Sequence, residues 1–202
     1  MSSIQDAEKY VNELKSANLD DRSKAIDTLA QLGHTEIVDF LIDLLTDAHH
    51  RLVKEGVCKT LGKIGDKRAV DVLITALKDE NESVRYQAAI ALGQIQDKKA
   101  IPPLLEILAK KGDPLVRSEA AKAVGLIGDP SALKILLNIL KNEDDRFIKY
   151  HSVTSLGRIG DKKAIKELSK IVKESDDERL ILRSIEAIES IQKTNNMKIS
   201  AS

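Results

Sequence analysis

Few histidine and cysteine side chains are available in this chain to bind a metal ion. There are four histidines, His34, His49, His50 and His151, and a single cysteine, Cys58. Iron or zinc chemistry needs several histidine, cysteine or carboxylate ligands that converge on one point. His49 and His50 are adjacent, so on a helix their side chains point about 100° apart and would not chelate one ion. We therefore expect no metal and no cofactor, with His49 and His50 in an exposed turn and His151 as an ordinary surface residue.

Nucleophilic chemistry has little more support. One cysteine excludes a disulfide framework and a thiolate zinc site. The apolar pattern places Cys58 among core positions, where a thiol behaves as a small buried hydrophobe rather than as a nucleophile. The sequence contains no glycine-rich phosphate loop, Gly-x-Ser-x-Gly elbow or His-Glu-x-x-His motif. These residues predict a protein that is not an enzyme.

The composition is typical of an all-helical protein. Of the 202 residues, 42% are hydrophobic, 32% are charged and only 2% are aromatic, which argues against a β-sandwich or barrel. Lys and Arg number 32, as do Asp and Glu, so the net charge is zero and nucleic acid is disfavoured as a partner. No window approaches the ~20 apolar residues of a membrane span, and the first residues lack the pattern of a signal peptide. We expect a cytoplasmic protein without a membrane partner.

A short motif recurs along the chain. It reads LGKIGD at 61–66, LGQIQD at 92–97, VGLIGD at 124–129 and LGRIGD at 156–161. The first glycine of each copy, called the anchor glycine here, is Gly62, Gly93, Gly125 or Gly157, with spacings of 31, 32 and 32 residues. Extending this period tiles the chain with six repeats, at about 4–33, 34–65, 66–96, 97–128, 129–160 and 161–193. We predict one domain over residues 1–193 and a polar, frayed tail over 194–202.

Each repeat has the pattern of two amphipathic helices. An aspartate such as Asp66 caps the first helix, and the glycine before it, such as Gly65, ends the preceding helix in the left-handed conformation. Gln96 stands where other repeats have this glycine, so its turn should be slightly strained or differently closed. Pro102 and Pro103 should start their helix late or kink it. Because a helical hairpin cannot bury its apolar face alone, the hairpins should stack into an all-α solenoid.

A column of basic residues lies eight positions before the anchor glycines. Its members are Arg22, Lys54, Arg85, Arg117 and Lys149, and a parallel column four residues earlier contains Asn81, Asp113, Asp145 and Asp177. A basic ladder could follow a phosphate backbone. On a helical wheel, however, this position lies beside the core. We interpret the column as charge pairs that tie neighbouring repeats together, with the arginine stems packed on apolar surface.

The second helix of each repeat carries the pattern Val-Arg-x-x-Ala-Ala-x-Ala-(Leu/Val)-Gly-x-Ile-Gly-Asp. The segments VRYQAAIALG at 84–93 and VRSEAAKAVG at 116–125 match it best. This pattern resembles the HEAT-repeat family, specifically its phycobilin-lyase-type short repeats. The resemblance covers nearly the whole chain and implies an α-solenoid of six HEAT-like hairpins whose second helices line a concave groove. It does not specify a function, because the family includes scaffolds, lyases and a metal oxygenase.

The resemblance suggests three further functions to consider: two enzyme activities and nucleic-acid binding. A HEAT-like deoxyhypusine hydroxylase binds a di-iron centre through His-Glu pairs, seven and six positions before the anchor. The residues at those places are Glu55-Gly56, Tyr86-Gln87, Ser118-Glu119 and Tyr150-His151, and no His-Glu pair occurs anywhere in the chain. We therefore expect this activity to be absent. A bilin-lyase-like or other ligand-handling function stays as the alternative, and nucleic-acid binding like that of HEAT-like DNA glycosylases as the third.

The groove face that the resemblance implies contains eight candidate binding residues. Four are apolar or aromatic and four are basic: Tyr86, Ile90, Leu126 and Tyr150, and Lys59, Lys63, Lys122 and Arg158. An exposed apolar stripe rimmed by charge is typical of a binding surface. Leu52, Leu115 and Phe147, at helix starts, are interpreted as staples of the preceding turn. The hypothesis is a non-catalytic scaffold that holds a peptide or helix of a partner protein, with the basic residues selecting an acidic partner.

Overall fold

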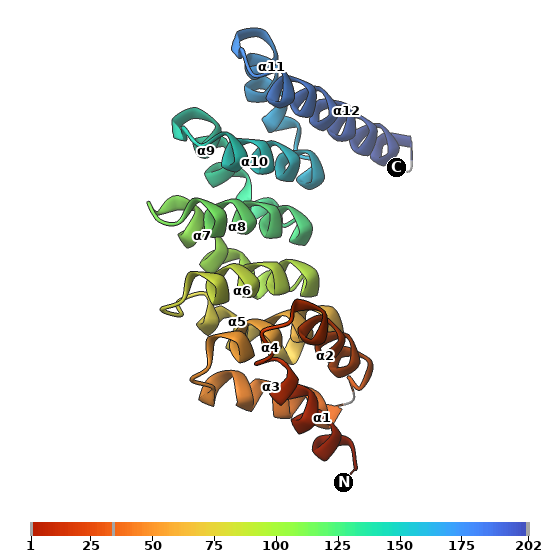
Figure 1. The fold of residues 1–202 in the computed structure, drawn as a ribbon. Coiled ribbons are helices and arrows are strands. Elements are labelled where there is room, and N and C mark those ends of the chain that lie inside the picture. Colours follow the sequence, from red (N-terminus) through yellow and green to blue (C-terminus); the bar gives the residue numbers. More distant parts are fainter. Residues whose placement is uncertain (1, 34, 201–202) are drawn as a thin grey trace. The chain divides into compact units, whose positions relative to one another are not determined.

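The computed structural model describes residues 2–33 and 35–200, and the side chains of residues 4–33 and 35–197. His34 lies outside the described residues. Within them the chain forms twelve α-helices, four short 3-10 helices and no strand, which confirms the all-α prediction. The chain divides into two compact units between Ala100 and Ile101, and each is a stack of helical hairpins, as predicted for an α-solenoid (Figure 1). The grouping of residues 1–193 into one domain stays a prediction.

Unit 1 contains the first three hairpins. Its elements are α1 (Ser2–Glu13), α2 (Leu19–Gln31), α3 (Thr35–Asp47), α4 (Arg51–Ile64), the 3-10 helix η1 (Lys67–Ala69), α5 (Val70–Ala76), α6 (Glu82–Ile95) and η2 (Lys98–Ala100). Helices α2, α4 and α6 pack side by side, while α1, α3 and α5 pack against them. Leu14, Leu41, Leu61 and Leu73 are fully buried in this unit.

Unit 2 contains the last three hairpins. Its elements are α7 (Ile101–Ala109), α8 (Pro114–Ile127), η3 (Pro130–Ala132), α9 (Leu133–Asn142), α10 (Arg146–Ile159), η4 (Lys162–Ala164), α11 (Ile165–Glu174) and α12 (Glu178–Ser200). Helices α8, α10 and α12 follow one another in one layer, with α7, α9 and α11 packed against them (Figure 1). Helix α12 continues to Ser200, so the polar residues 194–200 extend a helix where we expected a tail.

The repeated glycine and aspartate form the joint between hairpins. The glycines that end α4, α8 and α10 have φ values of 77°, 69° and 74°, in the left-handed region. The aspartates that follow each accept a hydrogen bond from the amide two residues later, which caps the 3-10 helix. Gln96 adopts the left-handed conformation with φ 58° and is the one non-glycine residue with positive φ among those described. The prediction of a strained turn there is confirmed, since this conformation costs about 1–2 kcal/mol for a residue with a Cβ.

The anchor glycines let neighbouring second helices approach closely. In unit 1, a Cβ built at Gly62 would lie 2.8 Å from the Cα of Ala91 on α6. In unit 2, a Cβ at Gly125 would lie 2.8 Å from the Cα of Ser155 on α10. Both distances are shorter than a carbon–carbon contact allows. The glycine therefore recurs because a following hairpin packs against it.

Two members of the basic column connect neighbouring hairpins through their turns. Lys54 pairs with Asp79 at 2.6 Å. Burial raises the pKa of Asp79, but the hydrogen bonds to this carboxylate, including that from Lys54, lower it more. Arg117 pairs with Glu143 and donates a hydrogen bond to the Leu108 carbonyl at 3.0 Å. The aspartates of the parallel column accept from the amides of their own helix starts instead: Asp113, Asp145 and Asp177. The structural interpretation is confirmed for Lys54 and Arg117, although their acidic partners differ from those expected.

The two prolines do not delay their helix. Helix α7 begins at Ile101, directly after η2, just as α5 begins at Val70 after η1. Pro102 and Pro103 therefore lie in the first turn, whose amides have no helical partners, so the missing N–H groups cost nothing. The expectation of a late start is wrong.

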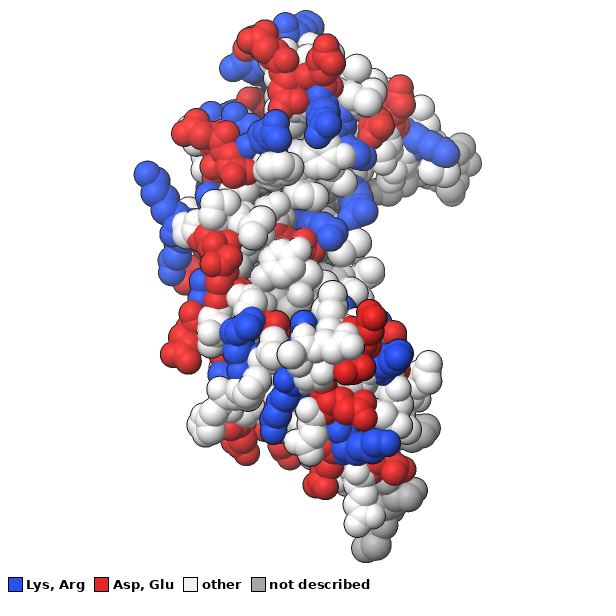
Figure 2. All heavy atoms as spheres, viewed as in Figure 1, with Lys and Arg blue, Asp and Glu red and all other residues white. Residues whose placement is uncertain are grey.

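Charges of both signs share the surface. Lys and Arg side chains are interspersed with Asp and Glu side chains within each unit, on the face drawn in Figure 2. In residues 2–33 and 35–200, each helix is too short or too polar to cross a bilayer.

Candidate functional site

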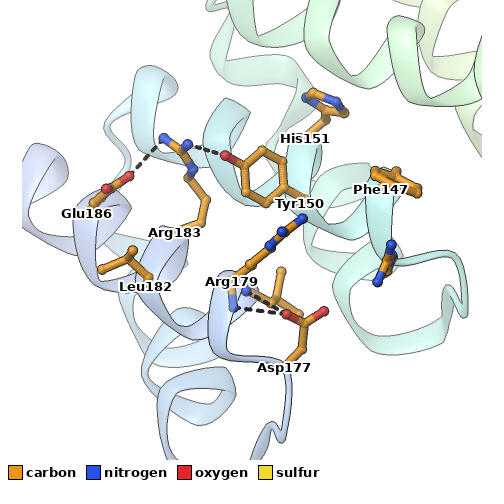
Figure 3. Close-up of a pocket in the computed structure, with 10 residues that line it drawn as sticks. Phe147, Tyr150, His151, Asp177, Arg179, Leu182, Arg183 and Glu186 are labelled. Atoms are coloured by element: carbon orange, nitrogen blue, oxygen red, sulfur yellow. Dashed lines mark hydrogen bonds and ion pairs between the residues drawn. The ribbon is translucent and has the colours of Figure 1, made fainter.

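A pocket of about 480 Å³ opens between α10 and α12 of unit 2. Helix α10 contributes Phe147 and Tyr150, which lie one turn apart on the same face. Helix α12 contributes Leu182 and Arg183 from its first turns (Figure 3). Phe147 and Leu182 are 54% and 60% exposed, so the mouth of the pocket is apolar.

Tyr150 and Arg183 point toward each other across this pocket (Figure 3). The Arg183 guanidinium donates a hydrogen bond to the Tyr150 hydroxyl, and its Cζ lies 4.7 Å from the centre of the tyrosine ring. Arg183 also pairs with Glu186, one turn further along α12, at 2.8 Å. The Nε atom of Arg183 is buried and has no hydrogen-bond partner among the described residues. The pair therefore links two hairpins and leaves one donor unused in the pocket wall.

Three guanidinium groups and two carboxylates line the pocket. Asp177 accepts hydrogen bonds from two amides at the start of its own helix, and Glu186 is bound to Arg183, so both carboxylates are engaged. Arg146 lies over the aromatic ring of the next residue at 4.8 Å. Across the described part of the chain, no carboxylate forms an ion pair with Arg146 or with Arg179. The pocket thus combines apolar walls with two guanidinium groups available to an anion.

His151 lines the same pocket next to Tyr150, with the two rings edge to face and 5.4 Å apart. It is half-buried, and not the ordinary surface residue that we expected. Burial lowers the pKa of His151, Glu119 opposes this, and Lys122 and Arg183 lower it further. The imidazole is therefore neutral at pH 7. Glu119 is itself buried and pairs with Lys122 at 3.0 Å.

The four predicted binding residues of unit 2 have different surroundings. Tyr150 lies in the pocket. Lys122 and Arg158 are exposed and close enough to His151 to act on its pKa. Leu126 is half-buried on α8 and takes no part in these contacts. Three of these four residues thus interact with His151.

The four predicted residues of unit 1 do not form a comparable site. Lys59 and Leu52 line a smaller pocket of about 130 Å³. Lys63 pairs with Asp27 of α2. The remaining two, Tyr86 and Ile90, are half-buried on α6. Their role in binding stays a prediction.

Sequence reasoning missed the arginines that line this pocket. Arg183 occupies the column six positions before the anchor, where the earlier repeats have Gly56, Gln87, Glu119 and His151. This column has no shared chemistry, so the periodic pattern gave no signal. Arg146 and Arg179 were missed for the same reason.

Cys58 is fully buried on α4, as predicted. Burial raises its pKa to about 12, so the thiol is protonated at neutral pH. A protonated thiol away from solvent is not a nucleophile.

The side chains do not fit the di-iron centre of the HEAT-like hydroxylases. Within the described residues, no three His, Cys, Asp or Glu side chains lie together as potential metal ligands. Glu119 and His151 stand at matching columns on neighbouring repeats, but Glu119 is engaged by Lys122. Two donors are too few for a pair of iron ions. The described part of this chain therefore does not supply such a centre by itself.

The HEAT repeats family model matches four overlapping segments, residues 7–80, 53–118, 70–152 and 101–189. The chain therefore belongs to the HEAT repeat family, which confirms the resemblance. The same fold occurs in a designed armadillo repeat protein, YIII(Dq.V1)4CPAF, which was solved in complex with the peptide (KR)4. The two structures align with a TM-score of 0.61 and 17% identity, over 91% of this chain and 98% of that chain. An engineered protein aligns with a TM-score of 0.60 and 21% identity over 93% of this chain and 99% of that chain.

The curated relatives are enzymes. Deoxyhypusine hydroxylase from Danio rerio is 40% identical over 95 residues, which cover 46% of this chain and 30% of the relative. Deoxyhypusine hydroxylase-B from Oryza sativa subsp. japonica is 44% identical over 66 residues, which cover 32% of this chain and 22% of the relative. The match thus spans less than a third of the length of these relatives.

These relatives overturn two expectations. The prediction of a non-catalytic scaffold, and of a protein that is not an enzyme, is wrong, because the similar proteins are hydroxylases. The expectation that the chain is not an enzyme depended on the missing nucleophile motifs and on the missing His-Glu pairs. A search for such motifs tests for particular active sites, and it says nothing of the relationship between the chains.

Proposed function

We propose that this chain takes part in an enzymatic protein modification related to deoxyhypusine hydroxylation by binding the protein substrate. The pocket between α10 and α12 holds an acidic segment of that substrate. The similarity to two deoxyhypusine hydroxylases supports the reaction class. The observation that carries the proposal is the apolar pocket whose Arg146 and Arg179 lack a carboxylate partner among the described residues.

The size and chemistry of the pocket favour a polypeptide ligand. About 480 Å³ accommodates one or two side chains rather than a whole folded surface. A ligand carboxylate matches the two-pronged geometry of a guanidinium, and an adjacent apolar side chain would cover Phe147 and Leu182. A designed armadillo protein of the same fold is in complex with a peptide. That peptide contains lysine and arginine, whereas the arginines here favour the opposite charge.

The pocket residues have separate tasks in this proposal. Arg179 and Arg146 bind the anionic group. Tyr150 and Arg183 hold each other in place and so fix the distance between α10 and α12. His151 supports the tyrosine ring and stays neutral, so it does not add a cation beside the ring.

The binding step is tested with labelled peptides. A short peptide of alternating Glu and Leu should bind in a fluorescence anisotropy titration, and its Lys-Leu counterpart should not. Arg179→Glu should weaken binding at least ~10-fold, because it replaces attraction by repulsion at the ligand anion. Lys166→Glu, an equal charge change at an exposed position of α11, is the control. Equal losses for Arg179→Glu and Lys166→Glu, or equal binding of both peptides, would refute the pocket assignment.

The reaction is tested separately in the host. The mass of the deoxyhypusine-bearing protein is compared between cells with and without the gene for this chain. Loss of the added hydroxyl oxygen in the deletion strain supports the link to hydroxylation. An unchanged mass refutes that link, whatever the peptide titration shows. A cytoplasmic location belongs to the same proposal and is checked by cell fractionation.

A further inference from the structure

The outward face of the last hairpin exposes residues that the preceding repeat buries. Ile185 and Ile188 of α12 correspond, one period later, to Val153 and Leu156 of α10. Val153 and Leu156 are fully buried, and α12 packs on their helix. Ile185, by contrast, is 38% exposed and Ile188 is half-buried. With Val172 of α11 they line an apolar pocket of about 220 Å³.

Another hairpin in the same register would not fit on this face. At Gly157, a Cβ would lie 3.0 Å from the Cα and the Cβ of Ala187, so the close approach of α12 favours a glycine there. The same position of the last repeat is Glu189, which is exposed and lines the open pocket. Its side chain occupies the space that a following hairpin would need. Whatever covers this face approaches less closely than α12 approaches α10.

The charges at the edges of this face complement each other. Lys173 lies on the α11 side of the pocket and Glu189 on the α12 side. Neither forms an ion pair within the described residues. In a two-fold contact, each surface meets its own copy, so a residue on one edge faces the opposite edge of the second molecule. If the two-fold axis runs parallel to α11 and α12, Lys173 of each copy faces Glu189 of the other copy. The contact then contains two such pairs.

We propose that this end face is a contact between two copies of the chain. The isoleucines and Val172 are buried at its centre, and two Lys173–Glu189 pairs close its edges. The apolar centre consists of three side chains, so the dimer is weak and depends on concentration. This proposal concerns a surface separate from the α10–α12 pocket and does not depend on it.

Sedimentation velocity of the full chain tests the proposal. The chain should shift from monomer to dimer as its concentration rises toward about 1 mM, the weak limit of specific association. Ile188→Asp should weaken the dimer at least ~10-fold, since it places a charge in each half of the apolar centre. Leu115→Asp, at a residue of α8 that is 64% exposed, is the matched control and should leave association unchanged. A monomer at every concentration, or equal losses for Ile188→Asp and Leu115→Asp, overturns the proposal.

Charge reversal gives a second readout that does not depend on the apolar core. Lys173→Glu alone and Glu189→Lys alone should each weaken self-association about tenfold, because each sets like charges against each other. An equimolar mixture of the two variants should restore the dimer, since the carboxylates of one variant then meet the ammonium groups of the other at both edges. Absence of restoration in the mixture overturns the two-fold pairing.

Discussion

Replacing Glu143 by glutamine would remove the charge from an ion pair that joins two hairpins of unit 2. Glu143 follows α9 and accepts hydrogen bonds from Arg117 of α8 and from the amides of Asp144 and Asp145, the latter two at 3.1 Å. The Arg117 and Glu143 side chains are 12% and 13% exposed. Glutamine keeps the shape and one acceptor oxygen. After the substitution, the guanidinium of Arg117 stays in a largely buried site without a carboxylate to balance its charge.

The loss of stability follows from this burial. Removing one partner of a buried ion pair costs about 3–5 kcal/mol. Arg117 keeps its hydrogen bond to the Leu108 carbonyl, and both side chains retain some solvent, so we expect about 2–3 kcal/mol here. For a chain of this size each kcal/mol lowers the melting temperature by about 2–4 °C, which gives a decrease of about 4–12 °C. Thermal unfolding followed by circular dichroism at pH 7 measures it.

The effect should vanish in acid. Burial raises the pKa of Glu143, but the hydrogen bonds from Arg117 and the two amides lower it more, so its folded value lies below the ordinary 4.5. A carboxyl group with a depressed folded pKa contributes stability above its unfolded pKa, and this contribution is lost as the pH falls through the folded pKa. The difference between the wild type and Glu143→Gln should therefore be complete at pH 7 and shrink below about pH 4.5.

Two comparisons make this prediction specific. Glu174→Gln breaks an exposed pair with Lys170 at 3.8 Å and should cost less than about 0.5 kcal/mol. Replacing Arg117 by methionine together with Glu143 by leucine should recover much of the loss, since apolar residues often substitute for a buried pair without cost. A Glu143→Gln melting temperature equal to that of Glu174→Gln at pH 7, or a difference that persists unchanged at pH 3, would refute this account of the turn.

Three further predictions concern the backbone and the thiol. Gln96→Gly should raise the free energy of unfolding by about 1 kcal/mol, because glycine adopts the left-handed conformation without strain; a lower melting temperature would contradict it. Gly125→Ala should lower stability by about 1–3 kcal/mol, since its Cβ would lie 2.8 Å from the Cα of Ser155. Gly112→Ala, whose Cβ would meet nothing within 4 Å, should change it little, and equal melting temperatures would count against the close approach. Cys58, with a pKa raised to about 12 by burial, should resist iodoacetamide in the native chain and react in urea; rapid labelling of the native chain would show that the thiol is accessible.

The sequence predicts the hairpins because two residues perform the same local tasks in several repeats. A glycine ends the second helix in the left-handed conformation, and an aspartate caps the helical turn that follows. These tasks depend on two or three neighbouring residues, so the linear pattern is sufficient. The prolines of α7 were misjudged because the short helix η2 precedes them and shifts them into the first turn. That shift depends on how the 3-10 turn and the α-helix join, which hydrophobic spacing does not report.

The pocket could be predicted only in part. Tyr150 was identified from its place on the helical wheel. Its partner Arg183 comes from the next repeat, 33 residues later, and the contact depends on how two helices pack. Such a contact leaves no periodic trace. The relationship to the hydroxylases was misjudged for a different reason, since a search for His-Glu pairs tests the presence of ligands rather than descent.

Agreement and disagreement between repeats carry different information in a stack of this kind. Positions that agree, such as the anchor glycines Gly62 and Gly125, are fixed by contact with the next hairpin of their unit, because a Cβ would collide there. Positions that differ are free of this constraint. Both proposed surfaces contain residues at such positions. Arg183, in the α10–α12 pocket, lies in a column without shared chemistry, and Glu189, on the end face, stands where the preceding repeats have the anchor glycine. If Glu189 is an anchor released from stacking, then Glu189→Ala should leave the fold of unit 2 intact and change only self-association. If Glu189→Ala unfolds α12 in a thermal melt, the residue serves the fold, and the end face is not available to a second copy.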